Sequence, residues 1–273
     1  MSRTPLIVLG AGGRMGRRIM ALAEAGTEAR VAGAVEIAGS GLVGRDAGEL
    51  AGTAALGVTV VADFVSAIDS ADRGAVAIDF TAPEAALAHA RQAASTGTPI
   101  VIGTTGFSRE QREELEGLAT RVPLLLSANM SVGVNVLLGL VAEAVRRLGP
   151  AFDIEIVEVH HNKKKDAPSG TALALAEAAA GAAGLDPASA LTLAREGQTG
   201  ERRKGEIGVM ALRGGDNVGE HTVMLLGTGE RVELSHRASS RDCLAVGAVR
   251  AGAWLHGKPP RLYSMKDVLG LTA

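Results

Sequence analysis

The chain has 273 residues, of which 47% are hydrophobic, and its formal net charge at pH 7 is −2. This length predicts one large domain or two ordinary ones with ample material for a buried core, and the near-neutral charge argues against a nucleic-acid-binding protein. Cys243 is the only cysteine, which excludes an internal disulfide and fits a reducing cytoplasm. The N-terminal apolar stretch is too short and too glycine-broken for a signal peptide or a membrane span.

The first half of the chain alternates short apolar runs with helical patterns. Strands are predicted at residues 6–9, 31–35, 76–80, 100–102 and 124–126, and helices at 14–25, 83–94 and 109–120. Apolar runs without polar alternation are typical of strands that are buried on both faces. Strands that alternate with helices predict an α/β fold with a doubly wound parallel sheet of the Rossmann type.

The pattern changes after about Asn129. A long apolar helix is predicted at residues 134–148, a strand at 153–160 and an alanine-rich helix at 169–183. Three extended segments follow, at 206–212, 221–226 and 231–237. Because glycine turns separate these segments, they predict an antiparallel meander. The second region is therefore expected to be α+β, with an open mixed or antiparallel sheet whose free face is available to a partner subunit.

The last stretch returns to a helical pattern. Asp242 can cap a helix that runs to His256, and Ser264 with Asp267 has the spacing of a capping box. We expect a dinucleotide-binding domain over residues 1–129, a substrate-binding and oligomerisation domain over 130–240, and a tail over 241–273. Periodicity does not say which domain the tail joins.

A glycine-rich loop separates the first predicted strand from the first predicted helix, with the residues Gly10, Ala11, Gly12, Gly13, Arg14, Met15 and Gly16. Glycines there permit a tight turn and a close approach to a pyrophosphate, and the helix N-terminus offers free N–H groups. Glu36, at the end of the second strand, can accept hydrogen bonds from ribose hydroxyls. Together these features predict a dinucleotide site; the alternative is an incidental glycine turn beside a solvated glutamate.

The residues around Glu36 also bear on the choice of cofactor. A carboxylate there repels a 2′-phosphate unless a cation is near, and Ile37 supplies none. The pattern favours NADH, although Arg14 is still able to reach a phosphate.

Two further loops follow predicted parallel strands, where ligands collect in open α/β sheets. Their residues are Gly103, Thr104, Thr105, Ser127, Ala128, Asn129 and Met130. The threonines can contact ribose, and Asn129 can orient a carboxamide. The alternative is ordinary loop chemistry.

Residues 160–171 form the most unusual segment, His-His-Asn-Lys-Lys-Lys-Asp-Ala-Pro-Ser-Gly-Thr. Two histidines end a strand, three lysines follow, and Ser169, Gly170 and Thr171 open a helix with free N–H groups and hydroxyls. This combination predicts a cationic pocket for a small dicarboxylate, with one carboxylate on the helix N-terminus and the other near His161 and Lys164.

Several other interpretations of residues 160–171 stay open. The segment can be a solvated basic loop before an ordinary helix cap. A metal site lacks the H-E-x-x-H or paired-carboxylate pattern, and nucleic-acid binding lacks an aromatic platform. No motif surrounds His89, His221, His236 or His256, which are expected to be structural or to lie on the surface, whereas Arg241 is a candidate third cationic contact.

Four motifs resemble the 4-hydroxy-tetrahydrodipicolinate reductase family, formerly called dihydrodipicolinate reductase. They are residues 10–16, Gly-Thr-Thr-Gly at 103–106, Asn129 with Ser-Val-Gly-Val-Asn at 131–135, and the segment 160–171. The resemblance runs over nearly the whole chain. It implies NADH- or NADPH-dependent reduction of a cyclic dicarboxylate in the diaminopimelate and lysine pathway, by a cytoplasmic homotetramer whose tail rejoins the nucleotide domain.

The resemblance also implies roles for single residues. His160 is similar to the catalytic histidine, Lys164 to the proton donor, and His161 to a substrate ligand. Ser169, Gly170 and Thr171 correspond to the cradle of a substrate carboxylate. The loop 10–16, Glu36 and the residues after the fourth and fifth predicted strands correspond to the cofactor site. Ile37 departs from members that carry an arginine at this position.

Two other functions are consistent with the same residues. One is another two-domain dehydrogenase, acting on an amino acid or a semialdehyde. The other is a dinucleotide-sensing regulatory module, which would bind NADH without turnover and would need no cationic pocket.

Overall fold

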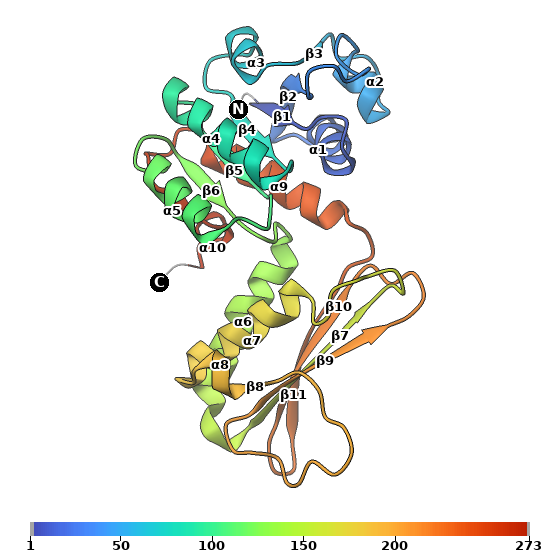
Figure 1. Ribbon diagram of the computed structural model, residues 1–273, viewed down its shortest axis with the longest axis vertical. Helices are drawn as coiled ribbons and strands as arrows, with labels where there is room; N and C mark the ends of the chain where they lie inside the picture. The colour runs from blue at the N-terminus through green and yellow to red at the C-terminus, as the bar shows by residue number, and fades with distance from the viewer. Residues whose placement is uncertain (1–2, 272–273) are drawn as a thin grey trace. The chain divides into compact units, whose positions relative to one another are not determined.

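A computed structural model describes residues 3–271 of the chain (Figure 1). These residues form two compact units. The first unit runs to Val132 and resumes at Asp242, and the second is Gly133–Arg241. The C-terminal segment therefore belongs to the same unit as the N-terminal strand.

The first unit is built on a seven-stranded sheet in which every neighbouring pair is parallel. In spatial order the strands are β12 (Leu262–Tyr263), β6 (Leu124–Leu126), β5 (Ile100–Ile102), β4 (Val76–Asp79), β1 (Thr4–Leu9), β2 (Ala29–Val35) and β3 (Val60–Val61). This arrangement confirms the predicted doubly wound, Rossmann-type sheet.

Helices cover both faces of this sheet. They are α1 (Arg14–Ala25), α2 (Ala47–Ala51), α3 (Phe64–Ser70), α4 (Pro83–Thr96), α5 (Arg109–Leu118), α9 (Asp242–Leu255) and α10 (Met265–Val268). One core cluster packs α1 and α9 on the sheet, and a second packs α3, α4 and α5. Both cores are mainly aliphatic, as expected from a sequence in which aromatic residues make up 2%.

The second unit places helices on a five-stranded mixed sheet. Its elements are α6 (Val132–Leu148), the short 3-10 helix η1 (Gly149–Ala151), β7 (Asp153–His160), α7 (Gly170–Ala183), α8 (Pro187–Ala190), β8 (Leu191–Thr192), β9 (Ile207–Arg213), β10 (Glu220–Leu226) and β11 (Arg231–Arg237). The strand order is β11-β10-β7-β9-β8. The expected α+β class with an open mixed sheet is confirmed.

The predicted meander of three consecutive strands is wrong in one respect. Strands β10 and β11 do pair antiparallel, but β9 pairs with β7 in parallel, and β7 lies between β9 and β10. The Gly214 amide donates to the His160 carbonyl (2.9 Å) and the Asn162 amide donates to the Gly215 carbonyl (3.2 Å). The double glycine is therefore tied to the end of β7 instead of forming a hairpin turn.

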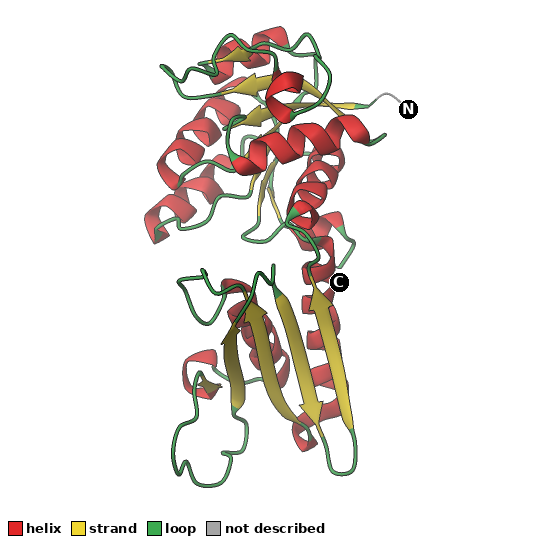
Figure 2. Ribbon diagram, turned by 90° about the vertical axis from the view of Figure 1, so that its right-hand side faces the viewer, coloured by secondary structure: helices red, strands yellow, loops and turns green. Residues whose placement is uncertain are grey.

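One face of the second sheet is covered and the other is open. Ile156, Val209 and Val223 point into a core shared with α6 and α7. In Figure 2 the strands lie in front of these helices, and no described element of the second unit covers them on the viewer's side. Between residues 3 and 271, no helix has both the length and the hydropathy that crossing a membrane requires.

Candidate functional site

The glycine loop lies at the carboxyl edge of the first sheet, between β1 and α1. A Cβ on Gly16 would lie 2.2 Å from the Gly10 carbonyl oxygen and 2.8 Å from the Cα of Ala11. Only glycine therefore allows α1 to start this close to β1. Gly13, the N-cap, makes no side-chain capping bond, so the first turn of α1 presents its amides and its dipole to an anion.

Glu36, which the sequence predicts to bind ribose hydroxyls, contacts this loop. Its Oε1 accepts a hydrogen bond from the Gly12 amide (2.7 Å), and its Oε2 accepts one from the Ile37 amide (3.0 Å). A Cβ on Gly12 would lie 3.0 Å from that Oε1. Gly12 thus allows the carboxylate to reach the loop, which places an acceptor beside the expected pyrophosphate position.

A cavity of about 400 Å³ opens beside Glu36 and is also lined by Gly10, Ile37, Asp63, Thr81 and His89. Among the described residues that line it, none is lysine or arginine. Ile37 is 77% exposed. The wall of the cavity thus carries two carboxylates and no fixed cation, which suits a ribose hydroxyl better than a phosphate.

Asp79, at the end of β4, is a fully buried carboxylate that organises the neighbouring loops, and sequence reasoning missed it. Its Oδ1 accepts hydrogen bonds from the Thr81 amide (2.8 Å), the Thr81 hydroxyl (2.7 Å) and the Thr104 hydroxyl (3.2 Å). Its Oδ2 lies 2.6 Å from Nδ1 of His89. The sequence did contain a signal that could have identified Asp79, because a charged residue directly follows the apolar run Val-Ala-Ile.

The other predicted cofactor loops follow β5 and β6. The Gly103 amide donates to the Asp79 carbonyl (2.8 Å), and the Ser127 amide donates to the Ile102 carbonyl (3.1 Å), so both loops lie at the carboxyl edge of the sheet. The Asn129 side chain accepts from the Ser131 amide (2.9 Å). Met130 is buried in the core cluster that includes α9, so its side chain is a packing residue.

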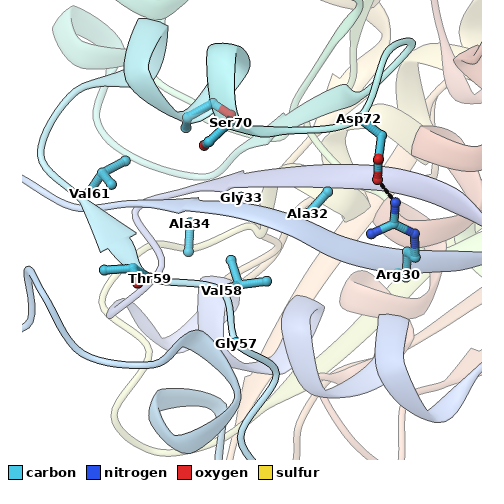
Figure 3. A pocket seen from close by; sticks show the side chains of 11 residues that line it. Arg30, Ala32, Gly33, Ala34, Gly57, Val58, Thr59, Val61, Ser70 and Asp72 are labelled. Carbon is cyan, nitrogen blue, oxygen red and sulfur yellow. Dashed lines mark hydrogen bonds and ion pairs between the residues drawn. The ribbon is translucent and has the colours of Figure 1, made fainter.

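A second cavity of the first unit, of about 380 Å³, lies alongside β2 (Figure 3). Small side chains such as Ala32 and Ala34 line it, and an ion pair between Arg30 and Asp72 crosses one end. None of the predicted cofactor contacts lines this cavity, so it is separate from the glycine-loop site.

In the second unit, helix α7 begins inside the segment 160–171. Ser169 is its N-cap and accepts a hydrogen bond from the Ala172 amide (3.2 Å). A Cβ added to Gly170 would have no described heavy atom within 4 Å. The space beside the first residue of α7 is therefore open, which leaves room for a carboxylate near the helix N-terminus. Thr171 follows in the first turn of the helix.

The predicted side chains His160, His161 and Lys164 come from the end of β7 and the loop after it. Nδ1 of His160 lies 2.5 Å from the Glu158 carboxylate. Nε2 of His161 lies 3.3 Å from the Arg241 guanidinium, so Arg241 does join the cationic group. Nζ of Lys164 pairs with Asp166 (2.9 Å), and the hydrogen bond from this ammonium lowers the pKa of the Asp166 carboxyl.

Glu158 and Arg213 also belong to this group, and sequence reasoning missed both. Glu158 is fully buried and accepts two hydrogen bonds from Arg213, each of 2.8 Å. Burial alone would raise the pKa of Glu158, but the bonds from Arg213, from His160 and from the Ser169 amide outweigh it and lower the pKa. Glu158 shares the inward-facing side of β7 with Ile154 and Ile156. A charged residue at such an alternating core position is the sequence signal that could have identified it.

His221 is buried behind the same group. Its Nε2 lies 3.1 Å from the Ser169 hydroxyl, and its ring meets the His160 ring edge-on with centroids 5.3 Å apart. Burial, reinforced by the nearby His160, lowers the pKa of His221 to about 4. It is thus a neutral histidine at physiological pH. Among the described residues, no group of three or more His, Cys, Asp or Glu side chains is placed to hold a metal ion.

A parallel sheet with a glycine loop at its carboxyl edge, together with a separate unit that carries His, Lys and Arg side chains beside a helix N-terminus, is typical of nucleotide-dependent oxidoreductases. Two family profiles match this chain: dihydrodipicolinate reductase, N-terminus, over residues 4–130, and dihydrodipicolinate reductase, C-terminus, over residues 133–269. The chain therefore belongs to the dihydrodipicolinate reductase family.

Individual relatives agree with the family profiles. The chain is 54% identical over 268 residues to the 4-hydroxy-tetrahydrodipicolinate reductase of Anaeromyxobacter dehalogenans (strain 2CP-1 / ATCC BAA-258), covering 98% of both chains. It is 50% identical over 269 residues to the enzyme of the same name in Geobacter sulfurreducens, covering 98% of this chain and 99% of the relative.

The fold matches a solved structure of the same family. The dipicolinate-bound dihydrodipicolinate reductase from Paenisporosarcina sp. TG-14 has a TM-score of 0.77 at 21% identity, covering 96% of this chain and 97% of that one. At this identity the likeness supports the fold alone.

Proposed function

We propose that this chain reduces 4-hydroxy-tetrahydrodipicolinate to tetrahydrodipicolinate, in the route to diaminopimelate and lysine, with a nicotinamide dinucleotide as the reductant. The net change replaces the 4-hydroxyl by hydrogen, so that a hydride and a proton are added and water leaves. Identity of about 50% over nearly the full length to reductases with this name supports the reaction.

The first unit fits the cofactor. The steric closeness at Gly16, the N-terminus of α1 without a side-chain cap and the Glu36 carboxylate together suit a pyrophosphate and a ribose. When bound, the nicotinamide supplies the hydride. The residues that we assign to holding it are the loop 10–16, Glu36, the residues 103–105 and the residues 127–130, with Met130 contributing through its backbone.

The second unit fits a small cyclic dicarboxylate. Ser169, Gly170 and Thr171 offer one carboxylate the first turn of α7, and His161 with Arg241 offers cationic contacts for the other. Lys164 delivers a proton to the ring as negative charge develops, and His160 takes part in the proton relay. The observation that carries this assignment is that one segment, 160–171, places both histidines, Lys164 and the start of α7 in the same group.

The cavity beside Glu36 supports a preference for NADH over NADPH. A 2′-phosphate would meet Glu36 and Asp63, and no described lysine or arginine lines the cavity to offset them. Arg14, within the loop 10–16, is exposed on the first turn of α1 and does not line the cavity.

The open face of the second sheet supports a homotetramer. Val157, Met210, Leu212 and Met224 lie on strands whose alternate residues face the core, and Leu212 is 52% exposed. An uncovered sheet face with such side chains suits contact with a second copy of the chain. Sedimentation velocity tests the homotetramer: Leu212→Asp should shift the protein to smaller species, and a monomeric wild type would contradict the proposal.

We place the enzyme in the cytoplasm, where its single cysteine stays reduced.

A coupled assay tests the activity. The purified chain is given the condensation product of pyruvate and aspartate semialdehyde, and NADH or NADPH oxidation is followed at 340 nm. We expect turnover with both cofactors and a higher kcat/KM with NADH. Aspartate semialdehyde alone with the reduced cofactor, and homoserine with NAD⁺ or NADP⁺, serve as controls, because turnover with one of them instead would indicate another dehydrogenase. NADH binding without any turnover would indicate a regulatory module.

A further inference from the structure

We propose that Glu158 is a positioning residue of the reductase, a buried carboxylate that fixes the His160 imidazole and the start of helix α7 relative to one another. Arg213 offsets its charge. The inference rests on the proposed role of His160 in the proton relay, and it assigns functions to two residues that lie outside the segment 160–171.

The contacts of Glu158 divide evenly between its two oxygens. Oε2 accepts from Nδ1 of His160 (2.5 Å) and from Arg213 (2.8 Å). Oε1 accepts from the Ser169 amide (3.0 Å) and from Arg213 (2.8 Å). Each oxygen therefore binds one end of the segment 160–171 together with one arm of the guanidinium, a bidentate geometry that fixes the carboxylate plane.

This geometry decides which nitrogen of His160 carries a proton. An ionised carboxylate only accepts hydrogen bonds, so Nδ1 must be the donor, and Nε2 is the nitrogen that remains for proton exchange. The ring is also confined sterically. A Cβ on Gly219 would lie 2.9 Å from Nε2, and the His221 ring packs edge-on against the imidazole. The tautomer and the ring orientation are thus set by the same group of residues.

Arg213 serves two purposes in this arrangement. Its guanidinium neutralises Glu158, which would otherwise repel a dianionic substrate through a medium of low dielectric constant. The same guanidinium donates to the Asp166 carbonyl (2.7 Å) in the loop that carries Lys164. The ion pair therefore braces the histidine, the lysine loop and the helix start together.

An amide cannot reproduce the contacts of this carboxylate. In Glu158→Gln one oxygen becomes an NH₂ group, which faces either Arg213 and His160 or Arg213 and the Ser169 amide. In both orientations donors meet donors. The variant keeps the side-chain shape and removes the acceptor pattern, so it separates positioning from packing.

The test compares Glu158→Gln with Glu206→Gln. Glu206 is also buried and pairs with Arg195 and Arg203, and none of its hydrogen bonds or ion pairs among the described residues involves the segment 160–171. Steady-state kinetics, NADH titration and ¹⁵N NMR of labelled histidine are measured on the full chain. For Glu158→Gln we expect kcat to fall at least about tenfold, NADH affinity to stay within about twofold, and the signal of Nδ1-protonated His160 to weaken. Glu206→Gln should keep the kinetics and the His160 spectrum of the wild type.

His160→Gln separates this inference from the proposed function. Lost turnover in His160→Gln together with unchanged kcat and unchanged His160 signals in a folded Glu158→Gln would overturn the inference while leaving the proposed function in place. Full turnover in His160→Gln would overturn the role of His160 in the proton relay and the inference that rests on it, while leaving the reaction itself in place. A fall in kcat of Glu158→Gln with no change in the His160 signals would also contradict positioning through the tautomer.

Discussion

Each unit contains a fully buried carboxylate at the end of a strand in the middle of its sheet, and the two differ in how their charge is met. Asp79 and Glu158 each lie within 2.6 Å of a histidine Nδ1, and each accepts from a backbone amide of a following segment. Asp79 is otherwise surrounded by threonine hydroxyls, whereas Glu158 is held by a bidentate arginine.

The difference follows from what each unit has to bind. Asp79 shapes loops beside the expected cofactor site, where hydroxyl donors are sufficient to order the backbone. Glu158 lies next to the expected dicarboxylate site, where a bare negative charge would oppose binding, so a guanidinium offsets it. On the function that we propose, the first unit is the general half of the enzyme, and the second determines what is reduced.

The largest expected effect comes from a substitution that removes the function of the second unit alone. Lys164→Ala should lower kcat by about 10²–10⁴-fold, because the proton that balances the developing negative charge is lost. NADH affinity, measured by fluorescence titration, should not change. Lys204→Ala in the same unit is the control and should retain wild-type turnover. Unaltered kcat in Lys164→Ala would contradict the assignment of the proton donor.

The converse experiment impairs cofactor binding by the first unit alone. In Gly16→Ala the new Cβ would clash with the Gly10 carbonyl, and relief of such overpacking costs about 1–3 kcal/mol. We expect NADH affinity to fall by roughly 10- to 100-fold, since 1.4 kcal/mol is a factor of ten, while the KM for the proposed dicarboxylate substrate stays unchanged. Gly117→Ala, on an exposed helix with no described heavy atom within 4 Å of the new Cβ, is the matched control. Equal loss of both ligands would show that the two units do not act separately.

Acid should weaken the second unit through His221. Its folded-state pKa of about 4 lies below its usual value of 6.5, so the unfolded chain binds the proton first as the pH falls. Stability is therefore lost between about pH 6.5 and 4, and between pH 7.5 and 5 the loss amounts to about 2 kcal/mol. Urea unfolding of wild type and His221→Gln checks this, because the variant should lose about that much less. His256→Gln, in the first unit, should keep the wild-type pH dependence.

The smallest expected effect concerns the preference for NADH over NADPH. Ile37→Arg places a cation beside the ribose pocket and should raise kcat/KM for NADPH about tenfold, a gain of about 1.4 kcal/mol. Ile37 is exposed, so stability should change little. Ile37→Gln controls for side-chain length without charge, and a wild type that already prefers NADPH would contradict our interpretation of Glu36.

Much of the fold follows from local patterns. Helix α1 and the strands β5, β6 and β7 have the predicted bounds, because apolar runs, glycine stops and helical periodicity are encoded nearby in the chain. The short elements β3, β8 and β12 have two residues each and leave no periodic signal. Strand pairing is not encoded locally either. The sequence therefore predicts β9 beside β10, whereas the structure has β9 beside β7.

The candidate site shows the same contrast between features that are encoded locally and features that depend on long-range pairing. Gly12 and Glu36 belong to a motif of known spacing, so the sequence could assign both to one dinucleotide site, although it did not predict the hydrogen bond between them. Glu158 and Arg213 are 55 residues apart, and only the parallel pairing of β7 with β9 brings their ends together. Long-range ion pairs of this kind depend on register, which a single sequence does not display.

The return of the C-terminal segment to the first unit has a consequence for biosynthesis. The core on one side of the first sheet includes Ala248, Leu255 and Tyr263, and a Cβ on Gly247 would overlap the Met130 carbonyl. A nascent chain leaving the ribosome can complete the second unit before α9 has been synthesised, but it cannot complete the first. The nucleotide-binding half begins synthesis first and finishes folding last.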